Sequence, residues 1–158
     1  MAEQFTEAAL PMPNSTATQP PKMGFTPPEG WRMGEAKDLP PAVQIMVIGK
    51  GIAAYPPSIN LAIEAYEGST KSYLKIVKSI NEKEGTRWKD LGAIQTEAGP
   101  ASLSQVDIST KWGEARMMHV ILVKQGYAYI MTASALKSEF PQFYKDFFAA
   151  MRSLRAIE

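Results

Sequence analysis

The 158-residue sequence contains no cysteine and a single histidine, His119. The absence of cysteine excludes disulfide bonds, thiol nucleophiles and cysteine-ligated zinc or iron–sulfur sites. A single histidine also excludes any metal site built on two histidine ligands. An excess of charge of one sign is lacking too, because 17 lysine and arginine residues against 16 aspartate and glutamate residues give a net charge of +1. A generally basic nucleic-acid-binding protein is therefore not expected.

Long hydrophobic runs are also lacking, since no stretch approaches the roughly 20 consecutive apolar residues that span a bilayer. The first 14 residues, MAEQFTEAALPMPN, have neither the basic region nor the long apolar region of an intact signal peptide. Two interpretations of the localisation stay open. The chain starts naturally at Met1 and is cytoplasmic, or an export signal has been removed and the protein belongs in the periplasm or cell envelope. Membrane contact would then come only through an N-terminal anchor absent from this chain.

Proline is unevenly distributed, with six of the 12 prolines in the first 28 residues. The segment before Met23 is also rich in serine, threonine, asparagine and glutamine, and such a segment buries too little apolar surface to offset its ordering entropy. We therefore predict a flexible tail or linker over residues 1–22. Residues 23–158 are predicted to form a single domain, which is long enough to bury one core, and the protein is expected to be a monomer.

Hydrophobic periodicity predicts an antiparallel sheet. Alternating or β-branched apolar runs between turn residues predict strands over residues 43–48, 59–66, 91–96, 103–112, 117–123 and 127–135. The turns predicted at 97–100, 113–114 and 124–126 are too short for a crossover, so the strands that they join should be antiparallel neighbours in a meander.

Two helices are predicted to cover this sheet. An apolar stripe between a Ser69 or Thr70 cap and Gly85 predicts a helix over 70–84. A second helix should follow Ser138, its predicted N-cap, with a stripe formed by Phe140, Phe143, Tyr144, Phe147, Met151 and Leu154. Residues 117–123 are almost continuously apolar, which predicts that both faces of the sheet are covered. The predicted fold class is α/β of the α+β type, an antiparallel meander with helices on both faces.

No catalytic, cofactor-binding or metal-binding residues are assigned. His119 could act as a general base only with a positioned partner, for which Glu114 and Asp107 are the candidates, and we favour a histidine held within the sheet. Gly-x-Ser-x-Gly and phosphate-loop motifs are absent, and Gly49-Lys50-Gly51 lacks the following helix that a phosphate site needs. The protein is therefore expected not to be an enzyme and to bind no cofactor.

Two groups of side chains are candidates for recognition. Lysines and an arginine on and after the first helix form a candidate partner-binding surface for an acidic protein or an anionic membrane: Lys71, Lys75, Lys78, Arg87 and Lys89. Several aromatic residues could line a pocket, although sheet spacing favours a place in the core. They are Trp31, Trp88, Trp112, Tyr127 and Tyr129, and Trp31 is expected to close one end of the core.

The order of elements resembles the PsbP-like superfamily. The resemblance is carried by Gly30-Trp31, by the strand–helix segment PPSINLAIEAYEGSTKSYLK, and by the closing segment GYAYIMTASALKSEFPQFYKDFFAAMRSLR. This superfamily includes the PsbP subunit of photosystem II, DcrB-type bacterial lipoproteins and a yeast transport factor that binds the GTPase Ran. The resemblance implies the family's fold and a role in binding or assembly, with no shared catalytic residues, and the DcrB-type envelope proteins are the nearest category.

Together these observations predict a non-enzymatic binding or assembly domain that recognises a protein partner, as the soluble part of a bacterial envelope lipoprotein if an export signal has been removed. The alternative is a small-molecule carrier or an enzyme with a pocket at one end of the sheet. A pocket that contains His119 and two convergent polar groups would favour this alternative. A nucleic-acid-binding protein acting through the lysines is a third class, which would require salt-sensitive association.

Overall fold

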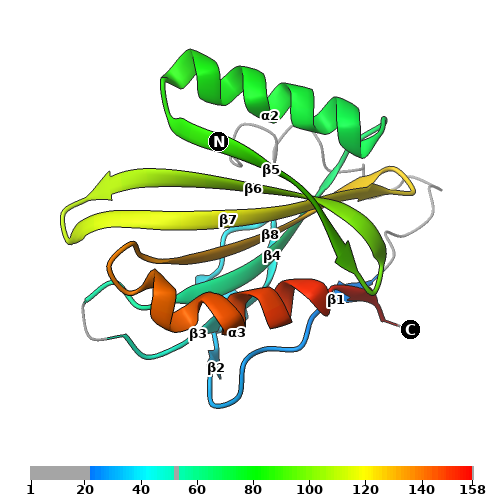
Figure 1. Cartoon of the computed structure of the whole chain (residues 1–158). Coiled ribbons are helices and arrows are strands. Elements are labelled where there is room, and N and C mark those ends of the chain that lie inside the picture. Colours follow the sequence, from blue (N-terminus) through cyan, green and yellow to red (C-terminus); the bar gives the residue numbers. More distant parts are fainter. Residues whose placement is uncertain (1–21, 52–53, 158) are drawn as a thin grey trace.

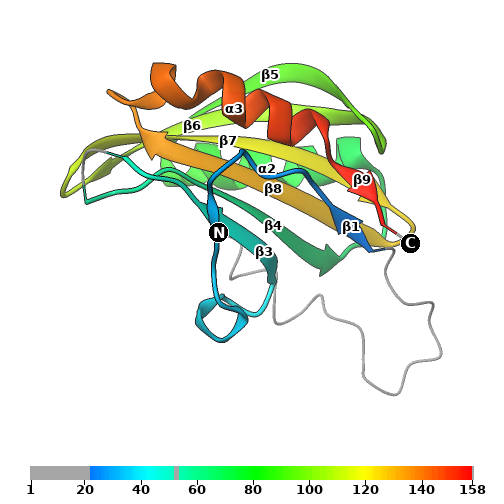
Figure 2. The same cartoon turned by 90° about the horizontal axis from the view of Figure 1, so that it is seen from below.

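A computed structural model describes residues 22–51 and 54–157. These residues form a seven-stranded antiparallel sheet with one helix packed on each face (Figures 1 and 2), which confirms the predicted fold class. The predicted tail lies outside the described residues except for Lys22, whose carbonyl oxygen accepts a hydrogen bond from the Ile157 N–H at 2.7 Å. None of the helices in the described part of the chain is long and apolar enough to cross a membrane.

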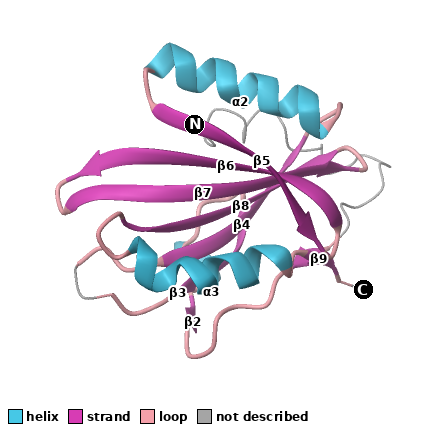
Figure 3. Cartoon of the chain, viewed as in Figure 1, coloured by secondary structure: helices cyan, strands magenta, loops and turns pink. Residues whose placement is uncertain are grey.

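The predicted meander forms one half of the sheet, and α2 links it to the other half (Figure 3). In spatial order the strands are β2 (Arg32–Met33), β3 (Val43–Ile48), β4 (Ser58–Ala65), β8 (Tyr127–Leu136), β7 (Gly113–Lys124), β6 (Gly99–Thr110) and β5 (Arg87–Thr96). The helix α2 (Thr70–Glu84) carries the chain from the interior strand β4 to the far edge strand β5. The chain therefore makes one long crossover over β8, β7 and β6, and the meander from β5 to β8 comes after it.

Two short strands join the ends of the described fold. β1 (Met23–Gly24) pairs antiparallel with β9 (Arg155–Ala156), so that Met23 lies opposite Ala156. Ile157 packs so closely over this pair that a Cβ on Gly24 would lie 2.1 Å from its Cδ1 atom. A short 3-10 helix, η1 (Ala36–Asp38), lies in the connection from β2 to β3.

The limits of α2 agree with the sequence prediction because local side chains determine both ends. The Ser69 hydroxyl accepts a hydrogen bond from the Ser72 N–H, and the Ser72 hydroxyl accepts one from the Ser69 N–H, each at 3.0 Å. This reciprocal pair satisfies N–H groups that the first helical turn leaves without a helical partner. Gly85 ends the helix in the left-handed conformation, with φ of 70°, which a residue with a Cβ adopts at a steric cost.

The C-terminal helix α3 (Phe140–Arg152) starts one residue later than a Ser138 cap would place it. Glu139 occupies the N-cap position, and Pro141 lies in the first turn, where the missing N–H of proline is tolerated. The predicted Ser138 cap is therefore wrong. Most of the predicted apolar stripe is buried, including Leu154 just beyond the helix, but Tyr144 is 49% exposed.

Trp31 packs against α3 and is partly buried beside the core. Its ring makes edge-to-face contacts with Phe143 and Phe147, each with ring centroids 6.1 Å apart. Gly49 makes room for this ring, because a Cβ there would lie 2.5 Å from a ring carbon of Trp31. Gly49 thus serves the packing of Trp31.

Several strand limits differ from the prediction, and β6 and β7 each begin four residues earlier than expected, at Gly99 and Gly113. β5 begins at Arg87, four residues before the predicted start, because β5 continues its pairing with β6 beyond a bulge at Leu91. The turn between β6 and β7 lies at Lys111–Trp112 rather than at 113–114. The Thr110 hydroxyl fixes it by donating to the Gly113 carbonyl at 2.6 Å and accepting from the Trp112 N–H at 3.1 Å.

The two faces of the sheet are covered to different extents. The face that packs against α3, here called the α3 face, carries the larger buried cluster, with Val120 of β7, Met131 of β8 and Phe147 of α3 at its centre. The opposite face, here called the α2 face, has a smaller cluster in which Tyr73 and Val77 of α2 meet Ile121 and Ala128. On this face Met117 and His119 are only half-buried. The continuous apolar run of β7 therefore predicted more complete burial of the α2 face than the structure has.

Candidate binding groove

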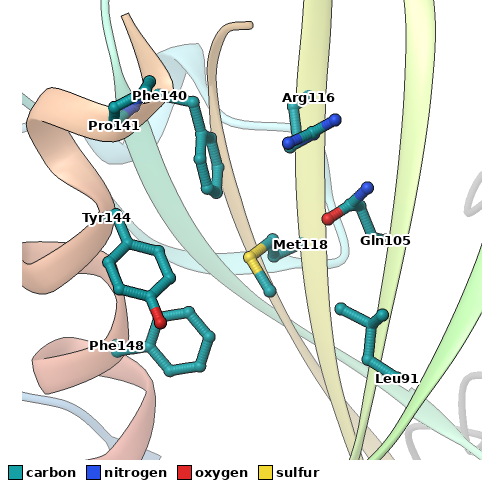
Figure 4. Close-up of a pocket in the computed structure, with 8 residues that line it drawn as sticks. All are labelled: Leu91, Gln105, Arg116, Met118, Phe140, Pro141, Tyr144 and Phe148. Carbon is teal, nitrogen blue, oxygen red and sulfur yellow. The ribbon is translucent and has the colours of Figure 1, made fainter.

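An apolar hollow of about 480 Å³ opens between α3 and the strands β5, β6 and β7 (Figure 4). We call it the α3 groove. Its walls and floor are formed by Leu91, Gln105, Arg116, Met118, Phe140, Pro141, Tyr144 and Phe148. Six of these eight side chains are apolar or aromatic, so the hollow favours apolar atoms over charged ones.

The helical wall of the α3 groove follows from the spacing of aromatic residues in α3. Phe140, Tyr144 and Phe148 recur every four residues, which places them on one side of the helix. Phe143 and Phe147 lie beside this row and enter the core. The helix therefore presents a wider apolar surface than the sheet beneath it covers. Tyr144 stays exposed, and Phe148 is partly buried against the core, with the two ring centroids 4.8 Å apart.

The opposite wall depends on a β-bulge in the edge strand β5. The pairing with β6 shifts between Asp90 and Gly92, which leaves Leu91 as the extra residue. The Asp90 carboxylate accepts a hydrogen bond from the Gly92 N–H at 2.8 Å, and Gly92 has φ of 94°. Leu91 is 37% exposed and lines the α3 groove. The bulge thus supplies an apolar side chain on a strand that is otherwise largely polar and exposed.

One end of the α3 groove is charged. The Arg116 guanidinium donates two hydrogen bonds to the Asp107 carboxylate, at 2.9 and 3.0 Å, and lies 5.6 Å from the centre of the Phe140 ring. The Lys137 ammonium lies 3.5 Å from the same carboxylate. Hydrogen bonding from Arg116 holds the pKa of Asp107 below its ordinary value, and hydrogen bonding to Asp107 raises the pKa of Arg116. Both side chains therefore stay ionised at neutral pH.

The five residues predicted to form a partner-binding surface do not form one surface. Lys71, Lys75 and Lys78 are exposed on α2. Lys89 lies opposite Gln105, which lines the α3 groove, and Arg87 lies opposite Asp107 and pairs with Glu114 at 3.0 Å. Since side chains two residues apart in a strand share a face, Arg87 and Lys89 belong to the α3 face, opposite α2. Their role in partner binding stays a prediction.

A second hollow of about 410 Å³ lies beside the β6–β7 turn. Trp112 lines it and is 46% exposed, and Trp112 also contacts the Tyr55 ring, with centroids 5.8 Å apart. Tyr127 and Tyr129 lie in the core, as expected for aromatic residues at sheet spacing. Of the predicted aromatic set, Trp112 borders this second hollow.

His119 lies in a polar row that crosses the α2 face. The strand register aligns it with Thr132 and Asn60 on one side and with Ser104 on the other. Burial lowers the pKa of His119 to about 4, so the imidazole is neutral at pH 7. The proposed partners Glu114 and Asp107 lie on the α3 face, and neither hollow contains His119.

Ser104 itself is buried, and its hydroxyl has no hydrogen-bond partner among the described residues. The described residues also contain no group of three histidine, aspartate or glutamate side chains placed to hold a metal ion. The polar row therefore offers no assembled catalytic constellation in this part of the chain.

Sequence reasoning missed a buried carboxylate between α2 and the sheet. Glu64 of β4 is 4% exposed and accepts a hydrogen bond from the Tyr73 hydroxyl of α2. Burial raises the pKa of Glu64 and, together with the hydrogen bond to Glu64, the pKa of Tyr73. The alternation of β4 places Glu64 on the same face as Asn60, but only the position of α2 shows that the carboxylate is buried.

Comparison with known proteins identifies the fold. No family model and no curated protein matches the sequence, but solved structures do match the fold. LpqN, involved in cell envelope biogenesis of Mycobacterium tuberculosis, aligns with a TM-score of 0.63 and 14% identity over 92% of this chain and 88% of LpqN. The cyanobacterial PsbP of Synechocystis aligns with a TM-score of 0.53 and 12% identity over 85% of this chain and 86% of its own.

A third similar structure is a protein of unknown function from Pseudomonas aeruginosa. It aligns with a TM-score of 0.53 and 16% identity over 81% of this chain and 98% of its own. At such identities the alignments show the fold alone, and they cover 81–92% of this chain and 86–98% of the matched proteins. The chain therefore has the PsbP-like fold that its strand–helix segments resemble.

Proposed function

We propose that this chain is a non-enzymatic binding domain that recognises a segment of another protein in the α3 groove. The observation that carries the proposal is the position of Leu91, Tyr144 and Phe148 around one hollow. These side chains come from an edge strand and a helix about 50 residues apart, yet they border one open hollow. Leu91 and Tyr144 are exposed and Phe148 is partly buried, and exposed apolar groups around a hollow are typical of interaction surfaces, where tyrosine is enriched.

The proposed location is the cell envelope. LpqN is involved in cell envelope biogenesis, and the DcrB-type lipoproteins that the sequence resembles belong to the envelope as well. A binding domain of this fold held at the envelope would present the α3 groove to other envelope proteins.

The alternative of a small-molecule carrier is favoured by the size of the α3 groove. A hollow of about 480 Å³ falls within the roughly 300–1,000 Å³ of small-molecule sites. Such sites usually enclose most of their ligand, however, whereas two of the walls here are exposed side chains, Leu91 and Tyr144. An open surface of this kind suits a protein segment, because the rest of the partner protein can shield the contact from solvent.

Site-specific photo-crosslinking in the native host tests the proposal. A benzoylphenylalanine at position 144 should give a discrete protein adduct, and Leu91→Asp should abolish this adduct. The matched control carries the same probe at position 75 on α2, where no adduct is expected. Adducts at position 75 alone would contradict the proposal in favour of the α2 lysines. A copurifying small molecule that Leu91→Asp displaces, with no protein adduct, would favour the carrier.

A further inference from the structure

We infer that the segment bound in the α3 groove is acidic and amphipathic, with large apolar side chains in the hollow and carboxylates against its rim. This inference rests on the proposed function and adds the chemistry of the partner. It follows from the charges that surround the hollow.

Cations lie along both sides of the α3 groove. On the strand side, Lys89 lies directly across from Gln105 on the same face. On the helix side, Lys145 follows the lining residue Pro141 by one helical turn, and the Arg152 guanidinium lies 5.2 Å from the centre of the Phe148 ring. All three are exposed, and none has an ion-pair partner within the described residues.

The acidic groups near the α3 groove do not balance these cations. Asp107 is held by Arg116 and Lys137, and Glu114 is within 4.0 Å of Arg87 and Lys137. Asp90 precedes Leu91 but lies opposite Ser104, on the other face of the sheet, and Glu97 lies in the turn beside Arg152. The charged end of the groove is therefore internally paired, and its long sides carry a surplus of positive charge.

This arrangement favours carboxylates on the partner more than any other charged group. An apolar segment alone would bury Leu91, Tyr144 and Phe148 but would leave Lys89 and Arg152 at the border without partners. Carboxylates beside the apolar side chains would pair with these cations at the rim, where the charges stay partly hydrated and the desolvation cost is small. Complementary charge of this kind mainly accelerates association and selects the partner.

The test selects peptides from a random phage-displayed library on the full chain and measures their affinities by fluorescence anisotropy. We expect the selected peptides to combine aromatic or large aliphatic residues with aspartate or glutamate. Changing their acidic residues to the matching amides should weaken binding, as should high salt. Lys89→Glu and Arg152→Glu should each weaken binding roughly fivefold or more, whereas the control Lys75→Glu on α2 should not.

The outcomes separate the inference from the proposed function. Peptides that lose binding with Tyr144→Ala but lack acidic residues, and that are insensitive to Lys89→Glu, would overturn the inference and leave the groove as the binding site. Selected peptides whose binding is unchanged by Tyr144→Ala and Leu91→Ser would overturn both. Circular dichroism of each variant separates lost binding from lost folding.

Discussion

His119 and Glu64 are ionisable residues that the fold buries at least in part, and they respond to pH in opposite ways. Burial lowers the pKa of His119 to about 4, from an ordinary value of 6.5. Between these values the unfolded chain binds a proton that the folded chain does not bind. The contribution of His119 to stability is therefore complete above about pH 6.5 and is lost as the pH falls towards 4.

We predict that His119→Gln reduces the loss of stability in acid. The free energy of unfolding of the wild type should fall by up to about 3 kcal/mol between pH 6.5 and pH 4 through this residue, and the variant should fall by less. Urea unfolding at a series of pH values measures the difference. The comparison with and without His119→Gln should be made in proteins that also carry Glu64→Gln. The raised pKa of Glu64 would otherwise add a contribution to the free energy of unfolding that increases as the pH falls. Identical pH profiles would contradict the prediction.

The Glu64–Tyr73 hydrogen bond joins α2 to β4, and the two partners should differ in their effect on stability. Tyr73→Phe removes the donor and leaves a buried carboxylate with one partner fewer, so it should cost about 1–3 kcal/mol at pH 7. Glu64→Gln keeps an acceptor for the Tyr73 hydroxyl and removes the buried charge, so stability should be unchanged or higher. Urea unfolding of both variants checks this order, and the reverse order would contradict it.

At the scale of elements, α3 has two neighbouring rows of aromatic residues with different roles. Phe147 is fully buried, whereas Tyr144, three residues earlier, is 49% exposed. Phe147→Ala should lower the free energy of unfolding by about 3–5 kcal/mol because it leaves a cavity in the core. Tyr144→Ala is the matched control on the same helix and should cost less than about 1 kcal/mol. Equal losses in thermal or urea unfolding would show that Tyr144 belongs to the core.

The elements differ in how far the sequence determined them. The limits of α2 were predictable because Ser69 and Gly85 act on their immediate neighbours. The exposure of Tyr144 was not, because periodicity shows that an apolar stripe exists and leaves its buried width undefined. That width depends on where β5 and β6 lie beneath α3.

The candidate groove could not be predicted for the same reason. Its two walls, Leu91 and the Tyr144–Phe148 pair, meet only through the sheet order and a bulge in β5. The five basic residues do not share one face because Arg87 and Lys89 belong to the strand after α2, and the face of a strand depends on its register. By contrast, the antiparallel meander followed from short turns, which are visible in the sequence.

At the scale of the whole molecule, the unequal cover of the two faces predicts unequal local stability. α3 contacts the large cluster around Phe147 and Met131, whereas α2 contributes Tyr73 and Val77 to a smaller cluster that borders the polar row at His119. We expect backbone amides of α2 to exchange with deuterium faster than those of α3. Hydrogen-exchange mass spectrometry compares the two helices within one sample, and slower exchange in α2 would contradict this expectation.

The antiparallel pair of β1 and β9 has a further consequence for protein engineering. Because Met23 lies opposite Ala156, a short glycine-rich linker could join residues 22 and 157, and the chain could be opened instead at the exposed Lys111–Trp112 turn. Such a circular permutant should fold to the same structure, with a similar far-ultraviolet spectrum and a cooperative melt. An aggregated or molten product would mean that the order in which the strands are synthesised matters for folding. The new termini would also allow reporter proteins to be fused at the β6–β7 turn.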